Sequence, residues 1–280
     1  MRQRGIGMND STVPAQYVTG KVRDGIEQAL VAAGKDLNGL KPADLALVED
    51  YHTGGRLATV QLVDLLELTP QSEVLDDGSG IGGTARYLAD RFGCAVTAVD
   101  LSDEYCETAH WLNRLVGLDD KIVVQQGDVT SLPLDDASVD VVFSQHVQMN
   151  VARKNRLYQE ARRVLRDGGR LALWDIMAGD GRELGYPLPW ADGPEHSFLV
   201  PPSVVRNEIE AAGFTVTHWA DLTDQVGAMM RMIQSQPPSP LGLHAFVPTF
   251  RERVTHLTEA LSDGRVRAVQ AIARAGTTAA

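Results

Sequence analysis

The hydrophobic pattern between residues 73 and 176 consists of short apolar runs that alternate with segments of helical periodicity. The runs with the length and composition of strands are 73–77, 95–100, 122–126, 139–144 and 170–176. Helical segments fall between them at about 82–92, 103–116 and 152–165, the last ended by an Asp-Gly-Gly turn at 167–169. Near-continuous apolar strands separated by helices are typical of parallel sheets with both faces covered, so the pattern predicts an α/β fold.

Weaker signals precede and follow this alternation. Helices are expected at about 24–33, 42–49 and 55–68, after residues 1–20, which carry little pattern. Beyond residue 176 we expect an irregular insertion rich in proline and aromatic residues, a helix at 204–212, a strand at 214–220, a helix at 248–261 and a last strand at 266–273. The prediction is an N-terminal arm and helical cap over 1–54 and one large domain over 55–280, with the insertion at about 179–202.

Charge and composition exclude several classes of function. The 280 residues include 26 Lys and Arg against 37 Asp and Glu, a net charge of -11, without a run of basic residues. A nucleic-acid surface needs a basic stripe to neutralise phosphates, so no nucleic-acid partner is expected. The apolar runs are too short to cross a bilayer, and no apolar stretch of a signal peptide follows the charged N-terminus. We therefore expect a cytoplasmic protein without membrane contact.

The cysteines and histidines give no metal or disulfide pattern. Cys94 and Cys106 are too few for a disulfide framework or a structural zinc site, and they read as reduced thiols. Histidines and cysteines are too scattered for a known metal spacing, so no metal is expected. A homodimer stays open, because nothing in the sequence fixes the oligomeric state.

A glycine-rich loop follows the first predicted strand and opens the next helix. Gly78, Gly80 and Gly83 have the Gly-x-Gly-x-x-Gly spacing of a dinucleotide-binding loop. Glycines there let backbone N–H groups approach a ligand, because no Cβ obstructs it. The spacing alone is a weak signal, and its position between a buried strand and a helix strengthens it.

Three aspartates stand at or just beyond the ends of the first three predicted strands, at Asp76, Asp100 and Asp128. Ligands bind outside the carboxyl ends of such strands, so these acids are expected around one crevice. So many carboxylates would repel the phosphates of NAD, whereas S-adenosylmethionine carries a sulfonium, an ammonium and no phosphate. The acids therefore favour S-adenosylmethionine as the cofactor. Taken singly, each aspartate could instead be a helix N-cap or a turn residue.

These segments resemble the class I S-adenosylmethionine-dependent methyltransferases. Leu-Asp-Asp-Gly-Ser-Gly-Ile-Gly-Gly at 75–83 looks like motif I, and Val-Asp-Leu-Ser at 99–102 is similar to the end of the second strand. Gly-Asp-Val at 127–129, followed by Leu-Pro-Leu-Asp, resembles the adenine-site segment, and 164–171 resembles the turn before the fifth strand. The resemblance implies a Rossmann-like, seven-stranded, mostly parallel sheet with helices on both faces and the last strand antiparallel. The complete predicted fold is this sheet with its helices and, in addition, the helical cap at the N-terminus.

A narrower resemblance, to the sarcosine/dimethylglycine N-methyltransferase branch, is carried by residues 51–59, 144–150 and 187–191. In this branch and in the related phosphoethanolamine methyltransferases, the Tyr-x-x-Gly-Gly stretch caps the methionine end of the cofactor, which makes His52 and Thr53 candidates here. An N-terminal tyrosine lies over the reacting centre of the phosphoethanolamine enzymes, and Tyr17 is its candidate counterpart.

Two departures limit what this resemblance implies. The phosphoethanolamine enzymes carry an acid at the position of His146 and a catalytic histidine at that of Asn150, so their substrate and catalytic pair are not expected here. Asp77 replaces the usual apolar residue of motif I. A carboxylate buried at that position is costly unless it is hydrogen-bonded or protonated.

The motifs and their neighbouring residues predict one site. The expected cofactor-binding residues are Thr53, Asp76, Gly78, Ser79, Gly80, Asp100, Leu101, Asp128, Val129 and Gln145. His146, just beyond the fourth strand, is the candidate general base, and hydrogen bonding to substrate or cofactor is the equal alternative. The expected substrate contacts are His52, Asn150, Asp175, Trp190 and Phe198. For Trp190 and Phe198 simple packing stays open, and for Asp175 a turn role.

The predicted function is methyl transfer to a small-molecule acceptor, at an amine nitrogen or at the oxygen or carbon of a natural-product metabolite. An NAD-dependent oxidoreductase is the first alternative. It would need a Tyr-x-x-x-Lys pair downstream of the sheet's start, and the one such spacing, Tyr17 to Lys21, lies upstream of the glycine loop. A non-catalytic module that binds S-adenosylmethionine is the second alternative.

Overall fold

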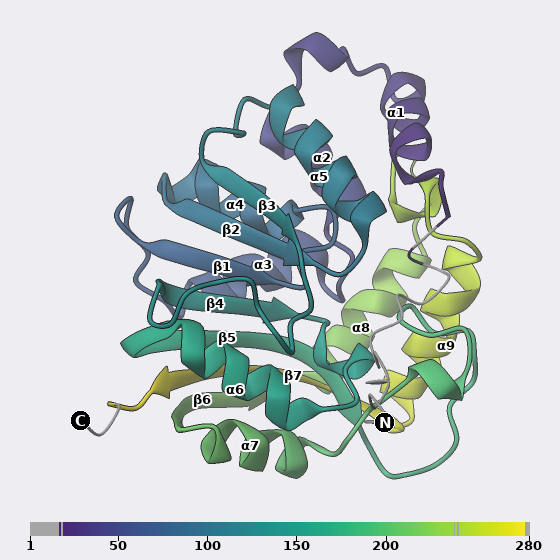
Figure 1. Cartoon of the computed structure of the whole chain (residues 1–280). Helices are drawn as coiled ribbons and strands as arrows, with labels where there is room; N and C mark the ends of the chain where they lie inside the picture. The colour runs from purple at the N-terminus through teal and green to yellow at the C-terminus, as the bar shows by residue number, and fades with distance from the viewer. Residues whose placement is uncertain (1–16, 18, 238, 240, 278–280) are drawn as a thin grey trace, which may run out of the picture.

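A twisted seven-stranded sheet organises the computed structural model, which describes residues 17, 19–237, 239 and 241–277 (Figure 1). The strand order is β3-β2-β1-β4-β5-β7-β6. The strands are β1 (Glu73–Asp77), β2 (Ala95–Asp100), β3 (Ile122–Gln126), β4 (Val139–Gln145), β5 (Leu165–Ala178), β6 (Phe214–Asp221) and β7 (Val266–Ala275). Neighbours among β1 to β5 pair in parallel, whereas β7 is antiparallel to both β5 and β6. The predicted seven-stranded, mostly parallel sheet with an antiparallel last strand is confirmed.

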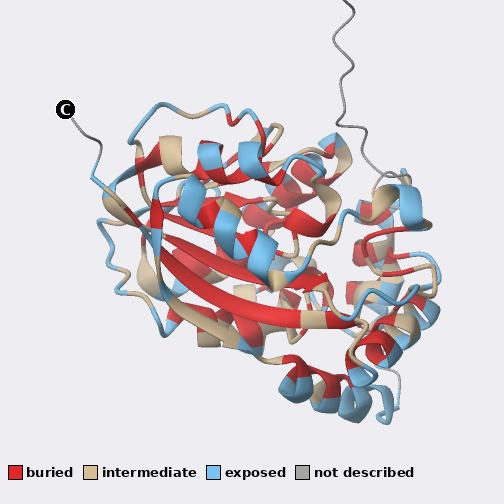
Figure 2. Ribbon diagram, turned by 90° about the horizontal axis from the view of Figure 1, so that it is seen from below, coloured by how far each residue is buried: buried red, intermediate tan, exposed pale blue. Residues whose placement is uncertain are grey.

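Helices cover both faces because alternate residues of each strand point to opposite sides. On β5, Ala172 and Trp174 belong to one hydrophobic core, and Leu171 and Leu173 to the other. The first core is closed by α3 (Gly55–Val63), α4 (Gly83–Phe92), α5 (Asp103–Leu115), α8 (Thr223–Gln234) and α9 (Phe250–Ser262). The second is closed by α6 (Lys154–Val164) and α7 (Pro202–Ala211). Figure 2 shows the buried strands between helices whose outer turns are exposed.

The predicted N-terminal cap is present as α1 (Val22–Ala32) and α2 (Pro42–Glu49). These helices form a third hydrophobic core with the outer face of α5, where Ile26 and Leu30 share a cluster with Trp111. Phe246 joins the same cluster from the far end of the chain. The segment around residues 241–247 therefore completes the cap, which the sequence assigned to residues 1–54 alone. Most of the predicted arm at 1–20 lies outside the described residues.

Two local features differ from the prediction. The Asp-Gly-Gly turn expected at 167–169 lies within the bounds of β5, which begins at Leu165 directly after α6. Its pairing with β4 is interrupted there, because the register passes from Leu165 to Arg170 and Gly168 has a φ of 78°. Gly169 passes so close to β4 that an added Cβ would lie 2.8 Å from the Asp140 carbonyl oxygen, so this irregular stretch favours glycine. The helix α8 was not expected, because its buried side is sparse, with Val226 and Met230 as its apolar members.

Candidate active site

A cavity of about 390 Å³ opens at the carboxyl ends of β1, β2 and β4, beneath the helical cap. A volume of this size is typical of small-molecule sites. The structure brings most of the predicted site residues together on its walls. They are Tyr17, His52, Asp76, Gly78, Ser79, Gly80, Asp100, Leu101, Asp128, Val129, Gln145, His146, Asn150 and Phe198.

The glycine loop needs glycine for two physical reasons. Gly78, Gly80 and Gly82 have φ values of 73°, 55° and 84°, which side chains disfavour. A Cβ on Gly78 would also lie 2.4 Å from Cγ2 of Val147. The loop is fixed to β2, since the N–H groups of Gly78 and Ser79 both donate to the Val99 carbonyl at 2.9 Å.

Each of the three predicted acids both lines the cavity and holds local backbone. Asp100 accepts hydrogen bonds from the N–H groups of Gly80 (2.7 Å) and Ser102 (2.9 Å), which ties the glycine loop to the start of α5. Asp128 accepts from Thr130 N at 2.7 Å in a turn. Asp76 accepts from Ala85 N at 3.1 Å, and burial raises the pKa of its carboxyl to about 7. A bound cation at this carboxylate would favour its ionised form.

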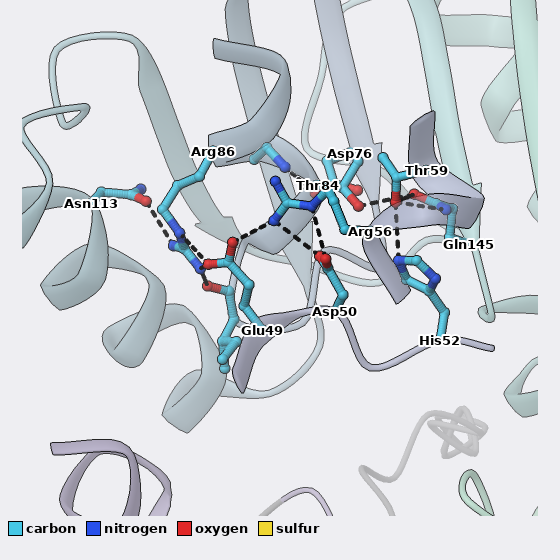
Figure 3. A network of polar contacts seen from close by, with 12 residues as sticks. Glu49, Asp50, His52, Arg56, Thr59, Asp76, Thr84, Arg86, Asn113 and Gln145 are labelled. Carbon is cyan, nitrogen blue, oxygen red and sulfur yellow. Dashed lines mark hydrogen bonds and ion pairs between the residues drawn. The ribbon is translucent and has the colours of Figure 1, made fainter. Parts of the chain in front are cut away.

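A chain of polar contacts runs behind the methionine-end candidates (Figure 3). Thr84 Oγ1, on α4, donates to Oε1 of Gln145 at 2.9 Å. Gln145 Nε2 donates to Thr59 Oγ1 at 3.4 Å, and Thr59 Oγ1 lies 3.2 Å from His52 Nε2. Gln145 and His52 line the cavity, so the chain holds two wall residues in fixed orientation.

A buried ion network joins the cap to the helix after the glycine loop (Figure 3). Glu49, at the end of α2, accepts from Arg86 Nε at 2.8 Å and from Arg56 Nη2 at 2.5 Å. Asp50 accepts from Arg56 Nε at 2.8 Å. Burial raises the pKa of Glu49, while the two guanidinium groups lower it. A Cβ at Gly83 would lie 2.9 Å from Asp50 Oδ1, so glycine allows this close approach of the cap.

His146 is held in an unusual conformation at the cavity wall. Its φ is 58°, in the left-handed region that is sparsely populated by residues other than glycine. Its Nε2 lies 2.9 Å from Thr53 Oγ1, and its ring centroid lies 6.0 Å from that of His52 in an edge-to-face arrangement. Burial, and secondarily His52, lower the pKa of His146 well below 6.5. The ring is therefore neutral at neutral pH.

Tyr17 and Asn150 also meet at the cavity wall. The Tyr17 hydroxyl donates to Asn150 Oδ1 at 3.4 Å, and the Tyr17 carbonyl accepts from Ser102 Oγ at 3.0 Å. Asn150 Nδ2 donates to the Trp190 carbonyl at 2.8 Å. Segments that are distant in sequence are thus joined at this point of the cavity.

Three predicted site residues do not line the cavity. Asp175 is buried, and its carboxylate accepts from the N–H groups of Val147, Gln148 and Ile176 at 2.8 to 3.1 Å, so it holds the turn after β4. Trp190 is buried, with its indole N–H donating to Ser197 Oγ at 2.9 Å. Thr53 lies behind His146 and orients that ring.

Other wall residues were not predicted from the sequence. The aromatic residues among them are Tyr51, Tyr105 and Phe246. Glu49 and Thr84 also line the cavity and belong to the networks described above. The available signal for Glu49 was an acid at the end of the predicted helix, two residues before the Tyr-x-x-Gly-Gly stretch begins at Tyr51. No sequence signal indicated Phe246, because this residue reaches the site only through the packing of the cap.

A buried lysine supports the wall that carries Phe198. Lys154 Nζ donates to the carbonyl oxygens of Phe198 (2.7 Å), Gln148 and Val151 (each 2.5 Å). Burial lowers its pKa to about 8. Within the described part of the chain, no group of three or more His, Cys, Asp or Glu side chains could hold a metal ion.

Comparison with known proteins agrees with this architecture. Residues 75–173 match the family described as a methyltransferase domain. The chain is 35% identical over 160 residues to the sarcosine/dimethylglycine N-methyltransferase of Halorhodospira halochloris, covering 57% of each chain. It is 29% identical over 192 residues to the glycine/sarcosine/dimethylglycine N-methyltransferase of Actinopolyspora halophila, covering 67% of this chain and 34% of that protein. These matches therefore span less than two thirds of the length of either relative.

The solved structures show the same fold. A geranyl diphosphate C-methyltransferase from Streptomyces coelicolor superposes with a TM-score of 0.68 over 94% of this chain and 96% of that one, at 17% identity. The resemblance seen in the motifs is thus confirmed at the level of domain and fold. Residues 75–173 match a methyltransferase domain, and the chain has the Rossmann-like fold of the S-adenosylmethionine-dependent methyltransferases.

Proposed function

We propose that this protein transfers a methyl group from S-adenosylmethionine to a small-molecule acceptor. The observation that carries the proposal is the convergence of the glycine loop with Asp76, Asp100 and Asp128 on one cavity. Ser79 Oγ adds support, because it is buried in this loop without a hydrogen-bond partner among the described residues. A polar ligand in the cavity would satisfy it.

The residues present fit this cofactor along the whole cavity. Asp76 and Gln145 would hold the methionine end, where the ammonium meets an acid. Asp100 would accept hydrogen bonds from the ribose hydroxyls, and Asp128 and Val129 would bind the adenine. When bound, the cofactor supplies a sulfonium-activated methyl group, which a lone pair of the acceptor attacks in line.

His146 is the residue that we propose for moving the acceptor's proton. Its ring is neutral, and Thr53 contacts Nε2 through its hydroxyl at 2.9 Å and its backbone N–H at 3.4 Å. Proton uptake at Nδ1 requires the tautomer in which Nε2 carries the hydrogen and donates it to the Thr53 hydroxyl. A base must be unprotonated before it acts, and burial secures that form. Tyr17 and Phe198 also line the cavity and would help to exclude water from the reacting group.

The alternatives have less support. For an NAD-dependent oxidoreductase, three carboxylates would face the cofactor phosphates, and Lys21 is not among the residues that line the cavity. A non-catalytic binding module would have no use for a strained, neutral histidine at the wall. No described helix has the length and apolar content to cross a membrane. A cytoplasmic location and a homodimer remain further proposals.

Calorimetric titration with S-adenosylhomocysteine, with NAD in parallel, tests the cofactor class. We expect micromolar binding of S-adenosylhomocysteine and no heat with NAD. Absence of S-adenosylhomocysteine binding, or tighter binding of NAD, would reject the proposal. Binding without methyl transfer to any acceptor of a broad panel would instead support the non-catalytic module.

A further inference from the structure

We infer that the acceptor presents an uncharged hydroxyl group to His52 and His146, and that it carries no carboxylate or phosphate at this end of the cavity. The inference rests on the proposed methyl transfer and concerns the substrate class. It differs from what the names of the sarcosine and dimethylglycine relatives indicate, because those substrates bear a carboxylate.

The two histidines form a polar pair without a charged side chain bonded to either ring. His52 Nε2 contacts the Thr59 hydroxyl at 3.2 Å, and His146 Nε2 contacts the Thr53 hydroxyl at 2.9 Å. His52 Nδ1 is buried and lacks a partner among the described residues, although the residue lines the cavity. Burial lowers the pKa of both rings, so the pair offers neutral donors and acceptors to a ligand.

The described part of the cavity wall offers no buried cation to an anionic acceptor. Of its acidic side chains, Glu49 is paired with Arg56 and Arg86, the three aspartates face the proposed cofactor, and Glu195 is exposed. Among the described lining residues, Arg153 is the one arginine or lysine, and it is exposed. An anion beside the histidine pair would lose its hydration and meet no buried cation among these lining residues, which makes its burial unfavourable.

Methylation of a charged amine places a stronger demand on the pair. An ammonium nitrogen is nucleophilic only after its proton has left. A buried imidazole with a lowered pKa is a poor acceptor for a proton that must leave before the attack begins. An acceptor hydroxyl has free lone pairs while its proton is still in place, so it can hydrogen-bond to the pair before reaction.

In the methylation of a hydroxyl group, every bond and proton is accounted for by the donor, the acceptor and the groups on the wall. One O–C bond forms, the S–C bond of the donor breaks with its electron pair left on sulfur, and one proton is released from the hydroxyl. An imidazole nitrogen of the pair takes that proton and later returns it to water. Asn150 and the Tyr17 hydroxyl supply further uncharged hydrogen-bonding groups, and Phe198 offers apolar contact for the body of the acceptor.

The charge state of the pair is measured first, by nitrogen-15 NMR of the imidazole rings in the intact protein. The His52→Gln and His146→Gln variants assign the two ring signals. We expect both rings to stay neutral as the pH is lowered from 8 through about 6.5, the value for a free histidine. A positively charged ring at neutral pH would overturn the inference, because the pair could then bind an anion.

Ligand preference is measured next with methyl gallate and gallate, which share the same hydroxyl groups and differ by one carboxylate. Binding is followed by NMR with S-adenosylhomocysteine at saturation, and sarcosine and phosphoethanolamine serve as charged comparisons. We expect methyl gallate to bind about tenfold or more tightly than gallate, and the preference to shrink in His52→Gln. Equal or tighter binding of gallate, sarcosine or phosphoethanolamine would overturn the inference, as would the absence of methyl gallate binding.

A matched control and the order of experiments separate this inference from the proposed function. His110→Gln removes an exposed histidine of α5 and should leave the preference unchanged. Failure of S-adenosylhomocysteine to bind would reject methyl transfer itself. Normal S-adenosylhomocysteine binding with a preference for anionic acceptors would reject only the hydroxyl inference.

Discussion

Glu49 and Arg86 form an ion pair in which both side chains are fully buried, with 2.7 Å between Arg86 Nη2 and Glu49 Oε2. The pair ties the last residue of α2 to α4, which begins directly after the glycine loop. Arg86 also donates to the Ile81 carbonyl at 2.7 Å and to Asn113 Oδ1 at 2.9 Å. The Arg86 guanidinium thus bonds to the cap, the glycine loop and α5, which all contribute to the walls of the cavity.

Removing one member of this pair should destabilise the protein strongly. Arg86→Ala leaves the Glu49 carboxylate buried with only Arg56 as a cationic partner, and we expect a loss of about 3–5 kcal/mol in the free energy of unfolding. Urea unfolding followed by circular dichroism measures it. The exposed pair of Arg166 and Asp140 is the control, since Arg166→Ala should cost less than about 1 kcal/mol. Similar losses in both variants would contradict a structural role for the buried pair.

The glycine loop should tolerate no side chain at its first position. In Gly78→Ala the new methyl group meets Val147 at 2.4 Å on a backbone with φ of 73°, so the loop must move. We expect binding of S-adenosylhomocysteine to weaken by about tenfold or more, because the loop backbone approaches the ligand. Gly117→Ala is matched in φ, at 67°, and has open space around its Cβ. It should lose some stability and keep its affinity.

Asp100 is expected to contribute to cofactor affinity through its carboxylate. Asp100→Ala removes an acceptor for the ribose hydroxyls and also frees the N–H groups of Gly80 and Ser102. We expect the affinity for S-adenosylhomocysteine to fall by about 1.5–3 kcal/mol, the range for hydrogen bonds to charged groups. Calorimetry measures it, with the exposed Asp103→Ala as the control. Unchanged affinity in Asp100→Ala would place the ribose elsewhere.

The sequence predicted β1, β2 and β3 well because each carries a short apolar run, even though β3 is an edge strand with Val123 exposed. The bounds of β1, β2 and β3 agree with the predicted runs, since continuous apolar residues leave a clear signal. The position of the site acids could also be predicted, because parallel strands bring their carboxyl ends to one edge of the sheet.

The direction in which a side chain points could not be predicted from the sequence. Asp175 stands at the end of β5 like the acids that line the cavity, yet its carboxylate turns to the backbone of residues 147 and 148. Position along a strand does not tell where a polar group finds its hydrogen bonds. The pairing of Thr53 with His146 and the arrival of Phe246 depend on the packing of distant segments, which leaves no local pattern.

Asp77 should lower stability at neutral pH. Its carboxyl is buried on the face of β1 opposite to Asp76, and neither oxygen has a hydrogen-bond partner among the described residues. Burial, with the nearby acids as secondary causes, raises its pKa well above 3.8. Below pH 3.8 the group is protonated in the folded and unfolded states alike. As the pH rises above that value the unfolded state ionises first, so stability is lost until the raised pKa is passed.

The Asp77→Asn variant removes this ionisation at nearly constant volume. We expect it to raise the free energy of unfolding by about 1–3 kcal/mol at pH 7, with the gain vanishing near pH 4. Thermal unfolding at a series of pH values measures the difference. Asp119→Asn, at an exposed position, should change stability by less than about 0.5 kcal/mol. A loss of stability in Asp77→Asn would mean that the charged carboxylate has a partner in the working protein.

His146 should govern turnover with little effect on cofactor binding. As general base it would contribute about 10²- to 10⁴-fold, so His146→Gln should lower kcat by that factor and leave the affinity for S-adenosylhomocysteine nearly unchanged. Burial lowers its pKa well below 6.5, so the neutral form persists on acidification. The wild-type rate should therefore not decline through pH 6.5 and should fall only at the lower pH where the ring takes up a proton. Transfer of a radiolabelled methyl group to the acceptor that binds best measures kcat and its pH dependence. Calorimetry measures the affinity for S-adenosylhomocysteine.

The companion variant Thr53→Val separates orientation from proton transfer at His146. It removes the hydroxyl that lies 2.9 Å from Nε2 and keeps the imidazole. We expect a smaller loss of kcat than in His146→Gln, because the base is present but less well held. The acid limb of the rate profile should move as well, since a freer ring gains contact with water and its pKa returns toward 6.5. If His146→Gln turns over at the wild-type rate, the proton leaves by another route and His52 becomes the base to test.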